Sequence, residues 1–213
     1  MSKITQQLKN WVGKFGQEYT DRNAISLEDV EKLYKKLYGI TRIELNRLFL
    51  SKMGRSIRIL EVGANIGNQL LCLQKMGFKN LYGIEPQKYA VEISKTRGLN
   101  IIEGNIFDIP FDDEYFDLVF TSGVLIHISP KDIKKAMREI HRCTKRYIWG
   151  LEYYSDKYAE VIYKGQKNLL WKADFAELYL NLFKDLELVM EKRLKYLDNK
   201  NIDSVFLLKK VRK

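Results

Sequence analysis

The chain has 213 residues and a formal net charge of +10, and hydrophobic residues make up 46% of it. This length suits one domain with a sizeable core, and the ordinary composition excludes a collagen-like or disordered chain. The sequence has neither an apolar leader nor about twenty consecutive apolar residues, so we expect a cytoplasmic protein that does not cross a membrane. The basic charge leaves nucleic acid, an anionic membrane surface and an anionic small substrate open as partners. Scattered lysines with interleaved acids also fit a merely solvated surface.

Cysteine and histidine are too few and too widely spaced for a metal site. Cys72, Cys143, His127 and His141 are the only residues of these two types, and no pair has the spacing of zinc ligands. We therefore expect two reduced thiols and no bound metal.

The sequence pattern divides the chain into two regions. Residues 1–52 have a helical pattern, which predicts an N-terminal helical cap, and residues 53–213 are expected to form one structural unit. From residue 57 onward, strands and helices alternate. Short apolar runs predict strands over residues 57–62, 80–84, 100–103, 116–121 and 146–151. Helical spacing predicts helices over residues 68–76, 89–96 and 175–183, and Pro130 suits the first turn of another helix that ends near Cys143.

The last third of the sequence departs from this alternation. Residues 153–171 are polar and aromatic, which predicts an irregular or helical insertion. Residues 186–196 and 204–211 are strand-like and flank a turn-rich tetrad, so they predict a hairpin at the edge of the sheet. The whole pattern predicts an α/β fold with a mostly parallel, doubly wound sheet, to which the hairpin adds an antiparallel strand.

The ends of the first two predicted strands carry a glycine turn and an acid. Gly63 permits a tight exit from the first strand, and Gly67 permits close approach of the helix and of a ligand. Glu85 ends the second strand 22 residues after Gly63 (85 − 63 = 22), where a carboxylate can accept hydrogen bonds from both ribose hydroxyls. Ligands of open α/β sheets lie at the carboxyl ends of strands. A glycine turn with a surface acid would look similar, but the combination favours a nucleoside site.

Two other nucleotide sites are disfavoured. A dinucleotide fingerprint requires glycine at positions 63, 65 and 68, and this chain has Asn65 and Asn68 at the last two. The sequence also lacks the Gly-Lys-Ser/Thr loop that binds nucleoside triphosphates.

Four motifs together resemble the class I S-adenosylmethionine-dependent methyltransferases. They are Glu61-x-Gly63-x-x-x-Gly67, Gly83-Ile84-Glu85-Pro86, the run over residues 104–111 and the run over residues 116–120. The resemblance covers roughly residues 57–151. It implies a Rossmann-like, mostly parallel seven-stranded sheet, S-adenosyl-L-methionine as cofactor and S-adenosyl-L-homocysteine as product. It also implies that Glu61, Gly63, Asn65 and Gly67 hold the methionine part and that Glu85 holds the ribose.

The same resemblance assigns residues to the adenine. Asn105 and Ile106 would address the edge of the ring, and Pro86 and Val124 would flank its faces. Two departures from the family pattern stand out. Asn65 replaces the usual central glycine, and asparagine tolerates positive φ better than most residues. Asn105 replaces the usual aspartate, and its amide can still bond the adenine edge.

A narrower resemblance spans nearly the whole chain. The runs over residues 15–23, 123–128 and 170–175 are similar to those of the pseudaminic acid biosynthesis-associated methylases. This implies an acidic or nucleotide-linked sugar of surface glycan (nonulosonic acid) biosynthesis as methyl acceptor. It also suggests that Tyr19 and Arg22 close over the cofactor, although a packed tyrosine and a surface ion pair would explain them equally. The family commonly has arginine where this chain has Ala173, which weakens any substrate role for that position.

The sequence offers few candidate residues for catalysis of methyl transfer or for binding of the acceptor. Methyl transfer depends mainly on positioning, and a base is needed only when the acceptor loses a proton. His127 follows the fourth predicted strand and is the candidate base, or else a packed histidine that holds its loop. Tyr153, Tyr154 and Trp171 are candidate substrate residues that are also typical of a core.

Three functions remain open from the sequence. The first is methylation of a small molecule. The second is methylation of RNA or DNA, which the charge suggests, although residues 121–124 do not match the Asn/Asp-Pro-Pro-aromatic loop of base amine methylation. The third is a protein that binds the cofactor without turnover, because a fold alone does not give an activity.

Overall fold

The computed structural model describes residues 5–211, and the chain divides after Pro110 into two compact units. In the described part of the chain, no helix combines the length and the apolar character needed to cross a bilayer.

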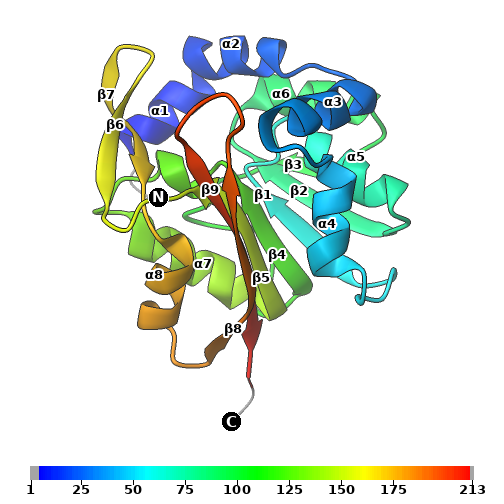
Figure 1. The fold of residues 1–213 in the computed structure, drawn as a ribbon. Helices are drawn as coiled ribbons and strands as arrows, with labels where there is room; N and C mark the ends of the chain where they lie inside the picture. The colour runs from blue at the N-terminus through cyan, green and yellow to red at the C-terminus, as the bar shows by residue number, and fades with distance from the viewer. Residues whose placement is uncertain (1–4, 212–213) are drawn as a thin grey trace. The chain divides into compact units, whose positions relative to one another are not determined.

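The first unit opens with four helices, which confirms the helical pattern expected there. They are α1 (Gln6–Val12), α2 (Lys14–Arg22), α3 (Leu27–Tyr38) and α4 (Arg42–Leu50), drawn in blue to cyan in Figure 1. Hydroxyl side chains begin three of them: Thr5, Ser26 and Thr41 each accept a backbone N–H of the first turn.

Three parallel strands follow in the first unit, in the order β3-β2-β1. They are β1 (Arg58–Val62), β2 (Asn80–Glu85) and β3 (Ile101–Glu103), with α5 (Asn68–Lys75) after β1 and α6 (Lys88–Thr96) after β2. In this register Val62 pairs with Ile84. The loop that leaves β1 therefore begins beside the end of β2, as the motif analysis requires.

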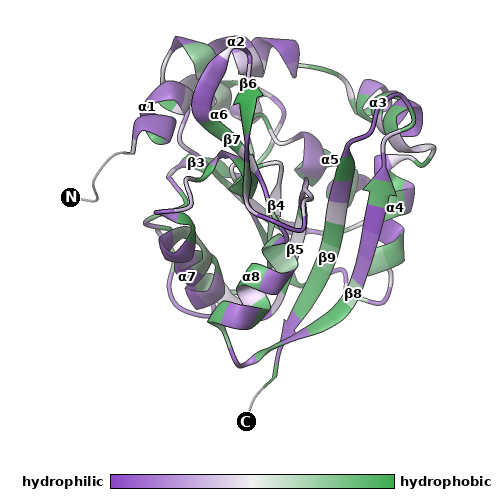
Figure 2. Ribbon diagram, turned by 60° about the vertical axis from the view of Figure 1, so that its left-hand side comes forward, coloured by the Kyte–Doolittle hydropathy of each residue, from purple (hydrophilic) through white to green (hydrophobic). Residues whose placement is uncertain are grey.

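The second unit contains four strands in the order β4-β5-β9-β8. β4 (Phe116–Ser122) and β5 (Thr144–Tyr153) are parallel, β9 (Ile202–Lys210) is antiparallel to β5, and β8 (Leu186–Lys195) is antiparallel to β9. Six consecutive residues of β9 are buried, and Figure 2 shows this strand as mainly hydrophobic. The expected C-terminal hairpin is confirmed, and the two units together supply the seven strands that the resemblance implies.

The insertion was interpreted wrongly from the sequence. Residues 154–158 are irregular, but β6 (Ala159–Tyr163) and β7 (Gln166–Lys172) form a separate antiparallel hairpin that the sequence did not predict. Lys164 and Gly165 connect them with φ angles of 49° and 75°, as in the tight turns whose twist suits hairpins. The exposed tip carries few apolar residues, so the strand pattern is weak.

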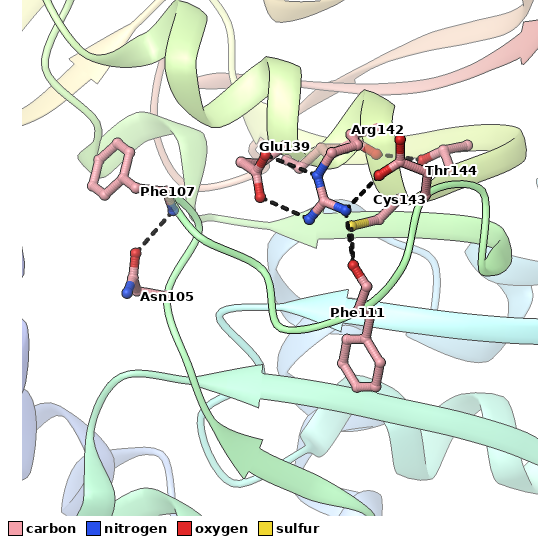
Figure 3. Close-up of polar contacts among 9 residues, drawn as sticks. Asn105, Phe107, Phe111, Glu139, Arg142, Cys143 and Thr144 are labelled. Carbon is pink, nitrogen blue, oxygen red and sulfur yellow. Dashed lines mark hydrogen bonds and ion pairs between the residues drawn. The ribbon is translucent and has the colours of Figure 1, made fainter. Parts of the chain in front are cut away.

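Helices α7 (Ile133–Cys143) and α8 (Phe175–Leu182) complete the second unit, with a 3-10 turn, η1 (Leu125–His127), after β4. The expected start of α7 at Pro130 is wrong by three residues, since Asp132 is the N-cap and Pro130 lies before it. At the end of α7, Arg142 donates to Glu139, to Asp113 and to the Phe111 carbonyl, which fixes the segment that precedes β4 (Figure 3).

Candidate functional site

The loop between β1 and α5 turns at three residues with left-handed backbone. Gly63, Asn65 and Gly67 have φ angles of 73°, 48° and 80°. Asn65 thus uses the tolerance that asparagine has for this region. Gly67 is the N-cap of α5 and makes no side-chain capping bond. The first turn of α5 therefore offers backbone donors at this edge of the sheet.

Gly67 is also required by packing. A Cβ atom added to it would lie 2.2 Å from Leu99 Cδ1 and 2.9 Å from Ile101 Cδ1. The close approach expected at Gly67 thus brings the loop against the side chains around β3.

Glu85, at the end of β2, is buried and held by two backbone donors. Its Oε2 accepts from the N–H of Asn65 over 2.8 Å, and its Oε1 accepts from the N–H of Gln87 over 2.9 Å. Burial raises the pKa of Glu85 to about 7, against the opposing effect of these two N–H groups. An ionised carboxylate has about four lone-pair sites, so each oxygen can accept one more donor.

Glu61, at the end of β1, is more deeply isolated. Burial raises its pKa well above the ordinary value, opposed chiefly by the positive charge of the buried Arg42. Within residues 5–211, neither Glu61 Oε2 nor Asn65 Oδ1 has a hydrogen-bond partner, although both atoms are buried. Buried acceptors normally have donors. The two atoms therefore fit a ligand that brings its own N–H or O–H groups to this loop.

The two residues proposed on the N-terminal cap differ in their surroundings. Tyr19 is half-buried, and its ring packs edge-on against Trp11 at 5.1 Å between centroids, whereas Arg22 is exposed. The residue of α2 that bonds the glycine loop is Thr20, which is fully buried and accepts from Asn65 Nδ2 over 2.9 Å.

The residues assigned to the adenine occupy the ends of β2 and β3. Asn105 Oδ1 accepts from the N–H of Phe107 over 2.9 Å (Figure 3), so the amide oxygen braces its own turn and the NH₂ group is left to act as a donor. Ile106 is buried and Pro86 is half-buried. Val124 belongs to the second unit.

His127 ends η1 in the second unit and is buried. Its Nδ1 lies 2.7 Å from the carbonyl oxygen of Leu169 on β7, so Nδ1 carries the proton and donates it. Burial lowers the pKa of His127 to about 4. The ring is then neutral at pH 7 and a weak base. This arrangement favours the packed histidine of the two alternatives, and the base role stays a prediction.

The loop after β4, which contains His127, is held by an acid near the C-terminal end of β5. Glu152 is fully buried, and its carboxylate accepts from the N–H groups of Val124 (3.2 Å) and Ile126 (3.4 Å). Burial raises the pKa of Glu152 to about 7, against the hydroxyl of Thr121 and the loop amides.

The candidate substrate aromatics have different packing partners. Tyr153 ends β5 and packs edge-on against Tyr196, while the Tyr154 ring lies 3.4 Å from the guanidinium carbon of Arg193. Trp171 is on β7 and is 5% exposed, as a core residue would be.

Three polar residues were missed from the sequence, namely Thr20, Gln87 and Glu152. Only Glu152 left a signal, since it is an acid within an otherwise apolar run. The partners of Thr20 and Gln87 are 45 and 74 or more residues away. In residues 5–211 no three His, Cys, Asp or Glu side chains gather closely enough to bind a metal ion.

Comparisons with known proteins agree with this geometry. The family described as "Methyltransferase domain" matches residues 60–147. An uncharacterized methyltransferase of Staphylococcus carnosus is 31% identical over 67% of this chain and 65% of its own length, so the chain spans just under two thirds of that relative. The "Putative methyltransferase YrhH" of Bacillus subtilis is 34% identical over 54% of this chain and 67% of its own length.

A solved structure extends the likeness to the whole fold. The 1,6-didemethyltoxoflavin-N1-methyltransferase of Burkholderia thailandensis, crystallised with 1,6-didemethyltoxoflavin and S-adenosylhomocysteine, has a TM-score of 0.73. The match covers 100% of this chain and 92% of that one at 14% identity, which shows a shared fold. The relative YrhH, of which this chain covers 67% at 34% identity, and the matching methyltransferase domain show that the chain belongs to the class I S-adenosylmethionine-dependent methyltransferase family, with which the glycine loop and the acid that ends β2 agree.

Proposed function

We propose that this protein binds S-adenosylmethionine at the carboxyl ends of β1 and β2 and transfers its methyl group to a small molecule. One observation carries the proposal. Glu85 is buried at the end of β2 and has two backbone donors, while two buried acceptor atoms, Glu61 Oε2 on β1 and Asn65 Oδ1 in the loop after it, have none within residues 5–211. The cofactor supplies a sulfonium methyl group that is ready for displacement by a nucleophile.

The proposed hydrogen bonds to the cofactor follow from these donors and acceptors. Glu85 accepts hydrogen bonds from the two ribose hydroxyls. Glu61 and Asn65 accept from the ammonium group of the methionine part. The amides of Asn68 and Gln69 at the start of α5 suit its carboxylate, while the amide of Leu70 bonds Glu61. Tyr19 and Arg22 are proposed to approach the same part from the N-terminal cap.

The remaining contacts would orient the base. In this proposal Asn105 and Ile106 address the adenine edge, and Pro86 and Val124 flank its faces. Because most of the acceleration can come from alignment of acceptor and methyl group, these contacts need not include a catalytic base. His127 is the candidate base if the acceptor must lose a proton.

An acidic or nucleotide-linked sugar of surface glycan biosynthesis is the proposed acceptor class. The similarity of the runs over residues 15–23, 123–128 and 170–175 to the pseudaminic acid-associated methylases supports it. The small heterocyclic substrate held by the Burkholderia relative supports a small acceptor more generally. Tyr153, Tyr154 and Trp171 are the proposed substrate residues.

Calorimetric titration with S-adenosylhomocysteine tests the cofactor site. We expect binding by the unmodified protein and affinity weakened by about 1–3 kcal/mol in Glu85→Ala, the usual loss when a charged hydrogen-bond partner is removed. Absence of binding by the unmodified protein would refute the proposal.

Mass spectrometry then tests the acceptor. Sugar-nucleotide and nonulosonic acid extracts, RNA and DNA are each incubated with cofactor and protein. A methyl increment in an acidic sugar supports the proposed acceptor class, whereas an increment confined to nucleic acid would replace it. Cofactor binding without any increment would favour a protein that binds without turnover.

A further inference from the structure

Two asparagines, Asn65 in the loop after β1 and Asn68 at the start of α5, bond the same N-terminal segment. Asn65 Nδ2 donates to Thr20 Oγ1 over 2.9 Å, and Asn68 Nδ2 donates to the Asn23 carbonyl over 3.0 Å. Arg97 donates to Asn68 Oδ1 over 2.7 Å, which orients that amide so that its NH₂ group faces Asn23. Asn65 stands where the family usually has a glycine, which has no side chain to make such a bond. We call residues 6–23, which comprise α1, α2 and the turn after them, the α1–α2 segment.

Gln87 makes a matching connection from the other side of Glu85. Gln87 Nε2 donates to the carbonyls of Trp11 and Gly13, each over 3.1 Å. Each carboxylate oxygen of Glu85 therefore accepts from the backbone of a residue, Asn65 or Gln87, whose own side chain bonds the α1–α2 segment.

These bonds are partly shielded from water, and each has one buried partner. Thr20 is 0% exposed and Gln87 is 4% exposed. Hydrogen bonds that are shielded from water are costly to break, because the separated groups stay desolvated. A bond from Tyr89 to Asp21, also between α6 and α2, is exposed and does not lead to Glu85.

We propose that Asn65 and Gln87 are positioning residues that couple the α1–α2 segment to Glu85, so that docking of this segment and the grip on the ribose strengthen each other. The inference rests on the proposed function for the identity of the ligand. Coupling of this kind is reciprocal. If the docked segment tightens cofactor binding by some factor, bound cofactor must stabilise the docked segment by the same factor.

The test is a double-mutant cycle on the bond between Asn65 and Thr20. Asn65→Gly keeps a residue that adopts positive φ and keeps the N–H that bonds Glu85, but removes the amide. Thr20→Val removes the partner hydroxyl without touching the loop. We expect Thr20→Val to weaken binding of S-adenosylhomocysteine about threefold to tenfold, the range for one net hydrogen bond. Asn65→Gly also removes the Oδ1 acceptor proposed for the ammonium group, so it should weaken binding at least as much, and adding Thr20→Val to it should weaken binding no further.

Three further variants sharpen the test. Thr20→Ser keeps the hydroxyl and should retain most of the affinity. Gln87→Ser can still cap α6 but cannot reach Trp11 or Gly13, so it should also weaken binding. Tyr89→Phe removes only the exposed bond and should bind the ligand as the unmodified protein does.

Hydrogen exchange supplies a readout that needs no cofactor. In the unliganded protein, Asn65→Gly, Thr20→Val and Gln87→Ser should each speed amide exchange in α2, and S-adenosylhomocysteine should slow that exchange in the unmodified protein. Additive losses of affinity, or unchanged α2 exchange in Asn65→Gly and Thr20→Val, would overturn the coupling. Failure of the unmodified protein to bind the ligand would instead refute the proposed function, while exchange in the unliganded variants would still show whether the two residues hold the segment.

Discussion

Binding of S-adenosylhomocysteine should tighten about tenfold between pH 6 and pH 8, because Glu85 titrates in this range. Burial raises the pKa of Glu85 to about 7. The carboxylate is then roughly one tenth ionised at pH 6 and nine tenths ionised at pH 8. Only the ionised form offers all its lone pairs to the ribose hydroxyls. If this form alone binds, the ninefold rise in its population corresponds to about 1.3 kcal/mol.

The magnitude can be checked by calorimetry at pH 6, 7 and 8 with Glu85→Gln as the matched variant. The amide has nearly the same shape but no charge to titrate, so its affinity should be nearly independent of pH and about 1–3 kcal/mol weaker at pH 8. Glu61 also titrates with a raised pKa. Adenosine, which has the ribose but no amino acid part, therefore serves as a second ligand that isolates the contribution of Glu85.

Proton release gives an independent measurement. Hydroxyl donors stabilise the ionised carboxylate, so binding near pH 6.5 should expel a proton from Glu85, and the apparent enthalpy should depend on the buffer. An unchanged pH slope in Glu85→Gln, or affinity that falls as pH rises in the unmodified protein, would refute the assignment of Glu85 to the ribose.

Three other changes test the packing around the two loops. Gly67→Ala should destabilise the fold by about 1–3 kcal/mol more than Gly98→Ala in urea denaturation, because both have positive φ but only Gly67 would clash; equal losses would contradict this. Glu152→Gln should reduce the pH dependence of unfolding: a carboxyl whose pKa rises from 4.5 to about 7 on folding makes the free energy of unfolding fall as pH rises through that window. An unchanged slope would refute the raised pKa. His127→Asn can still donate to the Leu169 carbonyl, so single-turnover rates within about threefold of normal are expected, whereas a loss of a hundredfold with intact cofactor affinity would make His127 the base.

Most strands could be predicted because their burial is continuous. Arg58–Val62 and Phe116–Ser122 are short apolar runs bounded by turn residues, and they form β1 and β4 with shifts of only one residue. The β6–β7 hairpin was missed because its outer half is exposed and carries little apolar alternation. A Lys164-Gly165 turn between the two strands was the available signal, since Gly165 adopts positive φ readily.

The residues of the candidate site were likewise only partly predictable from the sequence. The glycine loop and Glu85 could be predicted because both lie directly at strand ends, where chain direction alone brings them together. Thr20 and Gln87 could not be, because their roles depend on how a distant helix packs. The exposure of Arg22 likewise depends on which face of α2 meets the loop, and spacing with Tyr19 alone does not decide that.

The number of donors at each buried acid separates a ligand site from a structural brace. Glu85 is the last residue of β2 and Glu152 the last but one of β5. Each accepts an amide from the loop after the neighbouring strand, and burial raises the pKa of each to about 7. Glu152 is bonded by one hydroxyl and three amides, which occupies the roughly four lone-pair sites of a carboxylate. Glu85 receives two amides from the described residues, which leaves capacity for two further donors. A ribose diol supplies two, so the number of donors, rather than the similar pKa values, leads us to expect that Glu85 and not Glu152 binds the ligand.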